Sequence, residues 1–183
     1  LKGLNLNYFS EKNFKKISIF DSDIKTNFDS KKNIINLRGK YSLNEGTKLS
    51  FDISQSNNKE LLNVKLKADY DELFDIKTLN YVKKKGDIAN IDFDLVKNKN
   101  SIKINQINFK DGKNSLTLNG AKFSNGKLLI FDQFLVKTFK DNIKNNDFSI
   151  LFEKDILVRG DKFDASNIPK LLNKKNNGNI FSR

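Results

Sequence analysis

Apolar and polar residues alternate one by one along most of this 183-residue chain. The clearest runs are Leu49-Ser-Phe-Asp-Ile53 and Ile91-Asp-Phe-Asp-Leu95. A β-strand points successive side chains to opposite faces, so this period places the apolar residues on one face and Lys, Asn, Asp or Ser on the other. The pattern predicts a mainly β fold. Further runs with the same period lie at residues 4–8, 35–43, 62–68, 102–109, 116–118, 148–152 and 156–158.

Residues suited to tight turns separate these runs. Asp111-Gly112 and Asn125-Gly126 tolerate the positive φ that short hairpins need, and Asn44-Glu45-Gly46 separates two earlier runs in the same way. We therefore expect consecutive strands to pair antiparallel.

A recurring unit, apolar-x-apolar-x-Gly, occurs at residues 35–39, 116–120 and 156–160. The apolar phase slips by one residue after the second and third of these glycines, and again between Ile104 and Ile107. Such slips predict β-bulges, which bend a sheet. The expected fold is an elongated, strongly curved antiparallel sheet, shaped like a trough or groove.

Two stretches carry signs of a short helix. At residues 71–83 the apolar residues partly keep helical spacing, and at residues 166–174 Ser166 or Asn167 could cap a helix with Pro169 in its first turn. We expect one or two short helices there.

The length fits one domain. We interpret residues 1–183 as a single β-rich fragment of a larger repeat-built protein, with sub-units at 1–68 and 87–175 joined by the helical segment 71–83.

Composition excludes several kinds of chemistry. The chain has no Cys and no His, which removes thiolate nucleophiles, imidazole bases and the usual zinc ligands. We expect no catalytic activity, no metal and no cofactor. The net charge is +12, but the basic residues are nearly all Lys, with Arg only at positions 38, 159 and 183. Base-edge and phosphate recognition depend largely on Arg, so this balance disfavours nucleic acid as a partner.

Carboxylates recur two residues apart, as in Asp21/Asp23, Asp69/Asp71 and Asp92/Asp94. This spacing places both on one strand face, where a pair could serve acid–base chemistry or bind Ca²⁺. Asp92 and Asp94, however, point away from the apolar stripe of their strand. We therefore interpret the pairs as solvated surface.

The apolar stripes leave two architectures open. A closed barrel or sandwich would pack its inner faces on each other, whereas an open curved sheet needs something else on its apolar face. No polar residue interrupts the stripes regularly, as a pocket for a small polar ligand would require. The face therefore suits either acyl chains or a protein core.

Several segments have a recognisable sequence pattern, at residues 87–95, 104–109, 116–120 and 156–166, followed by 168–172. These segments resemble the AsmA-like superfamily, and more narrowly the central region of YhdP-type proteins. In that group a strand ending in Gly leads through Phe-Asp-Ala or Phe-Asp-Leu into a short helix with paired leucines, and residues 158–172 follow this pattern. The resemblance covers residues 60–175. It extends to the first 60 residues only in the general character of the sequence.

The resemblance implies a periplasmic segment of an envelope protein that is anchored in the inner membrane by a helix outside this fragment. Its apolar β-groove would conduct phospholipids between the inner and outer membranes. The implied partners are phospholipid acyl chains, the membrane through that anchor, and other envelope proteins. We predict that the groove contacts lipid through Phe51, Leu66, Phe93, Ile104, Phe109, Leu118, Phe123, Ile130, Phe152 and Val158.

The alternative is a structural or adhesin-like sheet, a scaffold with a dry protein core and a protein partner. The two hypotheses differ in what covers the apolar face.

Overall fold

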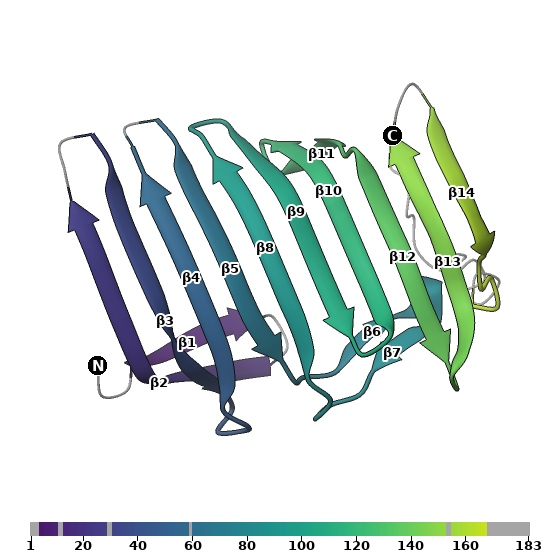
Figure 1. Ribbon diagram of the computed structural model, residues 1–183, viewed down its shortest axis with the longest axis horizontal. Helices are drawn as coiled ribbons and strands as arrows, with labels where there is room; N and C mark the ends of the chain where they lie inside the picture. Colours follow the sequence, from purple (N-terminus) through teal and green to yellow (C-terminus); the bar gives the residue numbers. More distant parts are fainter. Residues whose placement is uncertain (1–3, 11–12, 29–30, 59, 153–154, 168–183) are drawn as a thin grey trace.

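The computed structural model describes residues 4–10, 13–28, 31–58, 60–152 and 155–167, and the side chains in these ranges from Lys16 onward (Figure 1). The described residues form fourteen strands and one turn of 3-10 helix, η1, at Lys77–Leu79 between the seventh strand and the one before it. In chain order the strands are β1 (Leu4–Ser10), β2 (Asn13–Phe28), β3 (Asn33–Leu43), β4 (Leu49–Asn57), β5 (Leu62–Tyr70), β6 (Phe74–Ile76), β7 (Tyr81–Lys83), β8 (Ala89–Lys97), β9 (Ser101–Asp111), β10 (Asn114–Ser124), β11 (Lys127–Ile130), β12 (Gln133–Lys140), β13 (Ile143–Phe152) and β14 (Ile156–Lys162).

Twelve strands form one sheet in the order β1-β2-β3-β4-β5-β8-β9-β10-β12-β13-β14, with β11 paired to β10. All pairings are antiparallel, which confirms the mainly β fold and the antiparallel pairing expected from the alternation. β5 pairs directly with β8, so the expected sub-units 1–68 and 87–175 contribute to the same sheet. β6 and β7 form a separate hairpin.

The helix expected at residues 71–83 is wrong. This segment forms β6, η1 and β7, and the chain reverses at Asn80 with a left-handed φ of 48°. Phe74 and Ile76 alternate as in a strand and pack against the sheet, whereas Leu73, which completed the helical spacing, is exposed. Contacts with the sheet therefore outweigh the weak helical spacing of this segment. In the second expected helix, Ser166 and Asn167 form a turn, and residues 168–174 lie outside the described residues.

The β6–β7 hairpin packs on the apolar face of the sheet. Leu79 and Tyr81 join a core with residues of β8, β9, β10, β12 and β13. The ring of Phe109 lies 5.0 Å from that of Phe74 and 6.3 Å from that of Tyr81. The hairpin covers one end of the strands, which we call the lower end, as it is in Figure 1. The opposite strand tips, which form the upper end, lie away from it.

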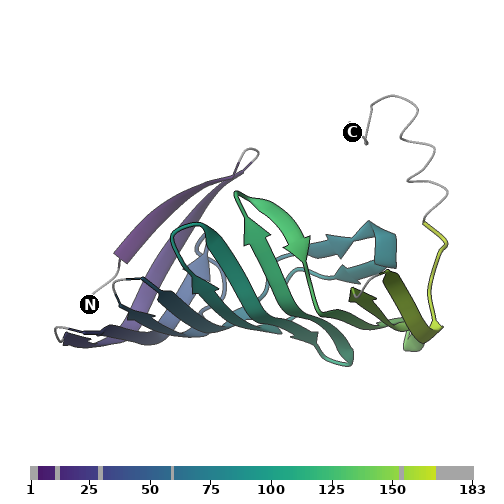
Figure 2. The same ribbon diagram turned by 90° about the horizontal axis from the view of Figure 1, so that it is seen from above.

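The sheet bends at several bulges. β2 shifts register against β3 between Phe20 and Asp23, and β8 shifts against β9 so that Asn105 is an additional residue. Gly160 lies beside a further bulge, between β13 and β14. Figure 2 shows that the sheet curves toward the side of the β6–β7 hairpin and that β1 with the first part of β2 projects to the same side. The result is a trough with the apolar face inside.

A network of buried amides holds the hairpin against the segment that follows β14. Asn146 donates to the Leu79 carbonyl at 2.7 Å and accepts from the Asp164 N–H at 2.9 Å. Asp164 in turn accepts from the Asn80 side chain at 2.8 Å and from the Ser166 N–H at 3.0 Å. Asp164 therefore orders the turn at 166–167.

Gly160→Ala should destabilise the chain by about 2–3 kcal/mol, because the new methyl group would overlap backbone atoms of β13. A Cβ there would lie 2.3 Å from the Asp147 carbonyl oxygen and 2.4 Å from the Phe148 Cα. Gly126→Ala is the control, because its φ of +74° costs alanine about 1 kcal/mol but the space around the new methyl group is open. Urea unfolding measures both losses, and equal losses would contradict the predicted overlap.

Asp164→Asn should lose more stability at neutral pH than in acid. Hydrogen bonds from the Ser166 side chain, then from Asn80 and the Ser166 backbone, hold the pKa of Asp164 well below its usual range. Because the folded-state pKa lies below the unfolded one, the charged group stabilises the fold above pH ~4 and progressively less below it. Urea midpoints of the two proteins should converge as the pH falls from about 4 toward 2. A gap independent of pH would show that the carboxylate charge is unimportant.

Candidate functional site: the apolar face of the sheet

The strand registers align apolar side chains into an unbroken row that crosses the sheet at right angles to the strands. We call it the central apolar row. Neighbouring strands lie about 4.8 Å apart, so the row is roughly 40 Å long. Its members, from β2 to β14, are Ile24, Leu37, Ile53, Leu66, Phe93, Ile107, Leu118, Phe134, Ile150 and Val158.

The middle of this row is only partly covered. Leu66, Phe93 and Leu118 are half-buried and lie outside the core beneath the hairpin. Toward β13, Phe134 and Ile150 pack against that core. The apolar face therefore has two parts, a dry core at the lower end and an open surface above it.

The predicted contact residues divide between these parts. Leu66, Phe93, Leu118 and Val158 belong to the central apolar row. Ile104 and Phe123 lie nearer the upper end of the same face and are half-buried. Next to the edge strand β14, Phe152 of β13 pairs with Ile156, and its ring lies 5.6 Å from that of Phe131.

Phe51 and Phe109 lie one row closer to the lower end and are both buried. Phe109 is part of the dry core, because Phe74 and Tyr81 cover its ring. The position of Phe109 therefore does not support its predicted contact with lipid in the groove.

Ile130 is not on the apolar face. β11 shifts register against β10, so Ile130 pairs with Lys122 of the opposite face, whereas Leu128 pairs with Phe123. Residues 128–131 are apolar in both phases, so alternation alone could not assign their faces.

The sequence-based set omits the remaining members of the row. Most of them, such as Ile53 and Ile107, lie in the same alternating runs as predicted residues and would follow from aligning the runs. Ile24 differs, because the irregularity at Asp21 and Ser22 separates it from Ile17 and Ile19 and hides the alternation of β2.

Two tyrosine hydroxyls at the lower end of the apolar face have hydrogen-bond partners. The Tyr41 hydroxyl donates to the Asp69 carbonyl, and burial raises the pKa of Tyr41 to about 12, with the charges of Asp71 and Asp69 adding to the effect. The Tyr81 hydroxyl donates to Asp111 at 2.8 Å. These groups fix the fold, and the central apolar row contains no donor that could orient a small polar ligand.

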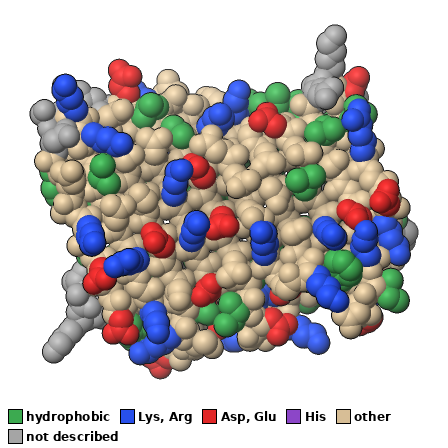
Figure 3. Space-filling model, in the orientation of Figure 1, with side chains coloured by type: hydrophobic (Ala, Val, Ile, Leu, Met, Phe, Trp, Pro, Cys, Tyr) green, Lys and Arg blue, Asp and Glu red, His purple; other side chains and the backbone are tan. Residues whose placement is uncertain are grey.

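On the outer face, a row of charged side chains crosses several of the same strands. Asp23, Arg38, Asp52, Lys67 and Asp92 lie opposite one another on β2, β3, β4, β5 and β8, so that their charges alternate in sign. Figure 3 shows basic and acidic side chains interspersed on this face. Its lysines are therefore largely offset by carboxylates, which agrees with a solvated surface.

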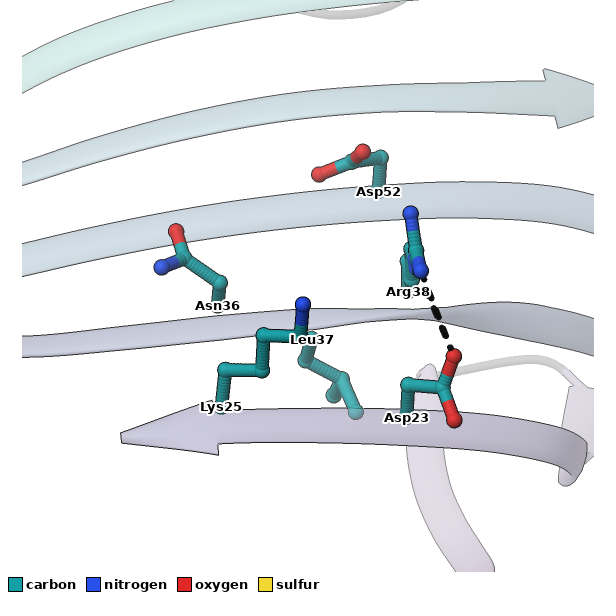
Figure 4. Close-up of a pocket in the computed structure, with 6 residues that line it drawn as sticks. All are labelled: Asp23, Lys25, Asn36, Leu37, Arg38 and Asp52. Carbon is teal, nitrogen blue, oxygen red and sulfur yellow. Dashed lines mark hydrogen bonds and ion pairs between the residues drawn. The ribbon is translucent and has the colours of Figure 1, made fainter. Parts of the chain in front are cut away.

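A shallow cavity of about 220 Å³ on the outer face lies within this row of alternating charges. Asp23, Arg38 and Asp52 line it, and Arg38 Nε lies 3.5 Å from Asp23 Oδ2 (Figure 4). The other carboxylate pairs are likewise engaged. Asp94 lies 3.4 Å from the Lys65 ammonium, and Asp69 accepts hydrogen bonds from the Asn90 side chain and the Ser50 N–H. None of these contacts forms a convergent acid–base pair.

The part of the chain that the structure describes contains no cluster of three or more His, Cys, Asp or Glu able to hold a metal ion. Within the same ranges, no helix is long and apolar enough to cross a membrane.

Comparison with protein-family models, with curated proteins and with solved structures gives no match to this chain. The fold and the site therefore define the class of molecule by themselves. It is an open, curved antiparallel sheet with one hydrocarbon face and one charged face.

A charge in the open part of the apolar face should be tolerated, whereas a charge in the dry core should unfold the protein. Phe93→Asp places a carboxylate on a half-buried surface, where water can solvate it. Phe109→Asp places one beneath two aromatic rings, where an unpaired charge is costly by several kcal/mol. Circular dichroism and urea unfolding should show folded Phe93→Asp and unfolded Phe109→Asp protein. If both variants unfold, the face above the hairpin is a closed core as well.

Proposed function

We propose that the apolar face binds phospholipid acyl chains, and that this chain is a segment of an AsmA-like envelope protein that conducts phospholipids between the inner and outer membranes. The localisation that belongs to this proposal is periplasmic, with an inner-membrane anchor elsewhere in the protein. The observation that carries it is the central apolar row, a continuous hydrocarbon path on the inside of a trough.

The dimensions of the row suit this cargo. An acyl chain spans half of a hydrocarbon core of about 30 Å, so the row of roughly 40 Å is long enough for more than one chain length. Transfer of a sixteen-carbon chain from water to such a surface recovers up to about 12 kcal/mol. The row holds the chain without directional bonds, so movement along it breaks no hydrogen bond.

The dry core beneath the β6–β7 hairpin favours the alternative, a structural or adhesin-like scaffold with a protein partner. Under that alternative a partner would cover the rest of the face as the hairpin covers its lower end. The half-buried state of Leu66, Phe93 and Leu118 fits either occupant. What lies on them in cells decides between the two functions.

Photo-crosslinking tests the proposal. A photoreactive residue at Phe93, Leu118 or Ile104 should form phospholipid adducts in cells, whereas one at Asp92 or Asn105 should not, because these two belong to the outer face. Mass spectrometry of the purified adducts identifies the lipid. Adducts with protein at the inner positions, or equal lipid labelling at both sets, would contradict the proposal.

A further inference from the structure

The upper end of β8, β9 and β10 carries a group of lysines that form no ion pair among the described residues. Between Leu95 and Phe131 the sequence has a single acidic residue, Asp111, and that residue lies at the lower end of the sheet, where it accepts from Tyr81. Lys97, Lys99, Lys103, Lys122 and Lys127 lie near the upper end. Among the described residues, no carboxylate is within ion-pair distance of these five lysines.

One pair of these lysines breaks the rule that the rest of the sheet follows. In the described strand registers, directly opposite charged residues have opposite signs, as in Lys67 and Asp92, with one exception. The exception is Lys103 of β9, which lies opposite Lys122 of β10. Their outer neighbours in the same row, Val96 and Ile130, are uncharged. Like charges placed directly opposite destabilise a sheet, so this pair, which lies on the outer face of the tip, adds unrelieved repulsion to its positive potential.

A cavity of about 200 Å³ lies at the same tip, between the β8–β9 and β10–β11 loops. Lys97 and Lys99 line it together with amide side chains of the loops, and Ile102 and Phe123 supply its apolar part. Asn98 orders the β8–β9 loop by accepting from the backbone N–H groups of Asn100 and Ser101 at 3.0 and 2.7 Å. The cavity thus combines two ammonium groups with an apolar wall in an ordered loop.

The cavity adjoins the apolar face. Lys97 lies opposite Leu62 and Ile102, so its side chain leaves β8 on the same face as Leu95 and Phe93. Lys97 lies four positions along the strand from Phe93, a distance of about 13 Å, which is close to half of the ~30 Å hydrocarbon core of a bilayer. An acyl chain whose headgroup sits at Lys97 would therefore reach the central apolar row.

We propose that this tip binds the phosphate of an anionic phospholipid whose acyl chain lies on the apolar face, with Lys97 and Lys99 as the phosphate-binding residues. The proposal rests on the proposed function and names its substrate class. Lys103 and Lys122 contribute positive potential at the same tip rather than a direct contact. The consequence is a preference for lipids with a net negative headgroup over zwitterionic lipids.

The test uses the full 183-residue chain and two probes, phosphatidylglycerol and phosphatidylethanolamine with the same photoreactive acyl chain. Lys97→Gln/Lys99→Gln should lower the yield of phosphatidylglycerol adduct roughly ten-fold, as expected for two lysines near an anionic headgroup, and bring it to the phosphatidylethanolamine level. The control, Lys65→Gln/Lys67→Gln, makes the same change in net charge at lysines that face Asp94, Asp52 and Asp92, and should keep the preference.

A second variant tests the contribution of the like-charge pair to stability and to the positive potential of the tip. Lys103→Gln/Lys122→Gln should raise the midpoint of thermal unfolding, because it removes the like-charge pair, and should also weaken the preference for phosphatidylglycerol. A preference that survives in both tip variants, or that the control variant loses equally, would overturn the proposal. So would full displacement of phosphatidylglycerol by an equal concentration of inorganic phosphate, since the site would then be independent of the acyl chain.

Failure of this inference is distinguishable from failure of the proposed function. If the unmodified chain forms adducts with both lipids equally, the apolar face still binds acyl chains and only the headgroup site is wrong. If it forms adducts with neither, the acyl-binding proposal itself has failed, and the tip proposal fails with it.

Discussion

Cross-strand register is the constraint on which the rest of this structure depends. Each strand alternates polar and apolar residues, but only a consistent register from β2 to β14 turns separate stripes into a continuous row. The same register places Arg38 between Asp23 and Asp52, and Lys67 between Asp52 and Asp92, on the other face. A slip of one residue in any strand would exchange the two faces of that strand. It would place a polar residue in the apolar row and an apolar residue in the charged row, so both rows favour the observed register.

The bulge of β9 is compatible with this register because a matching irregularity occurs in the neighbouring strand β10. Asn105 is the additional residue of β9, and Gly120 of β10 lies opposite it, so the phase changes in both strands at the same height. Ile107 and Leu118 therefore stay aligned below the irregularity, as do Ile104 and Ala121 above it. The sheet gains curvature without losing its apolar face.

Alternation predicted the fold class and the inner face well, because both follow from the two-residue period of a strand. It failed where the period is broken or where both phases are apolar. The irregularity at Asp21 and Ser22 hid β2 and with it Ile24, and the register shift in β11 moved Ile130 to the outer face. The division of the apolar face depends on residues 71–83, because only their folding as a hairpin places Phe109 in a dry core.

The exposure of the row bears on what occupies it. A closed core is most buried at its centre and sealed at its margins, whereas the end residues of the central apolar row, Ile24 and Val158, are 47% and 61% exposed. Nothing polar interrupts the row between them, and the amide network around Asn146 holds the hairpin at the lower end, beside the row. A row that is hydrocarbon throughout and exposed at both ends matches a mobile acyl chain better than a single docked side chain. That geometry is why we prefer a lipid conduit to a scaffold.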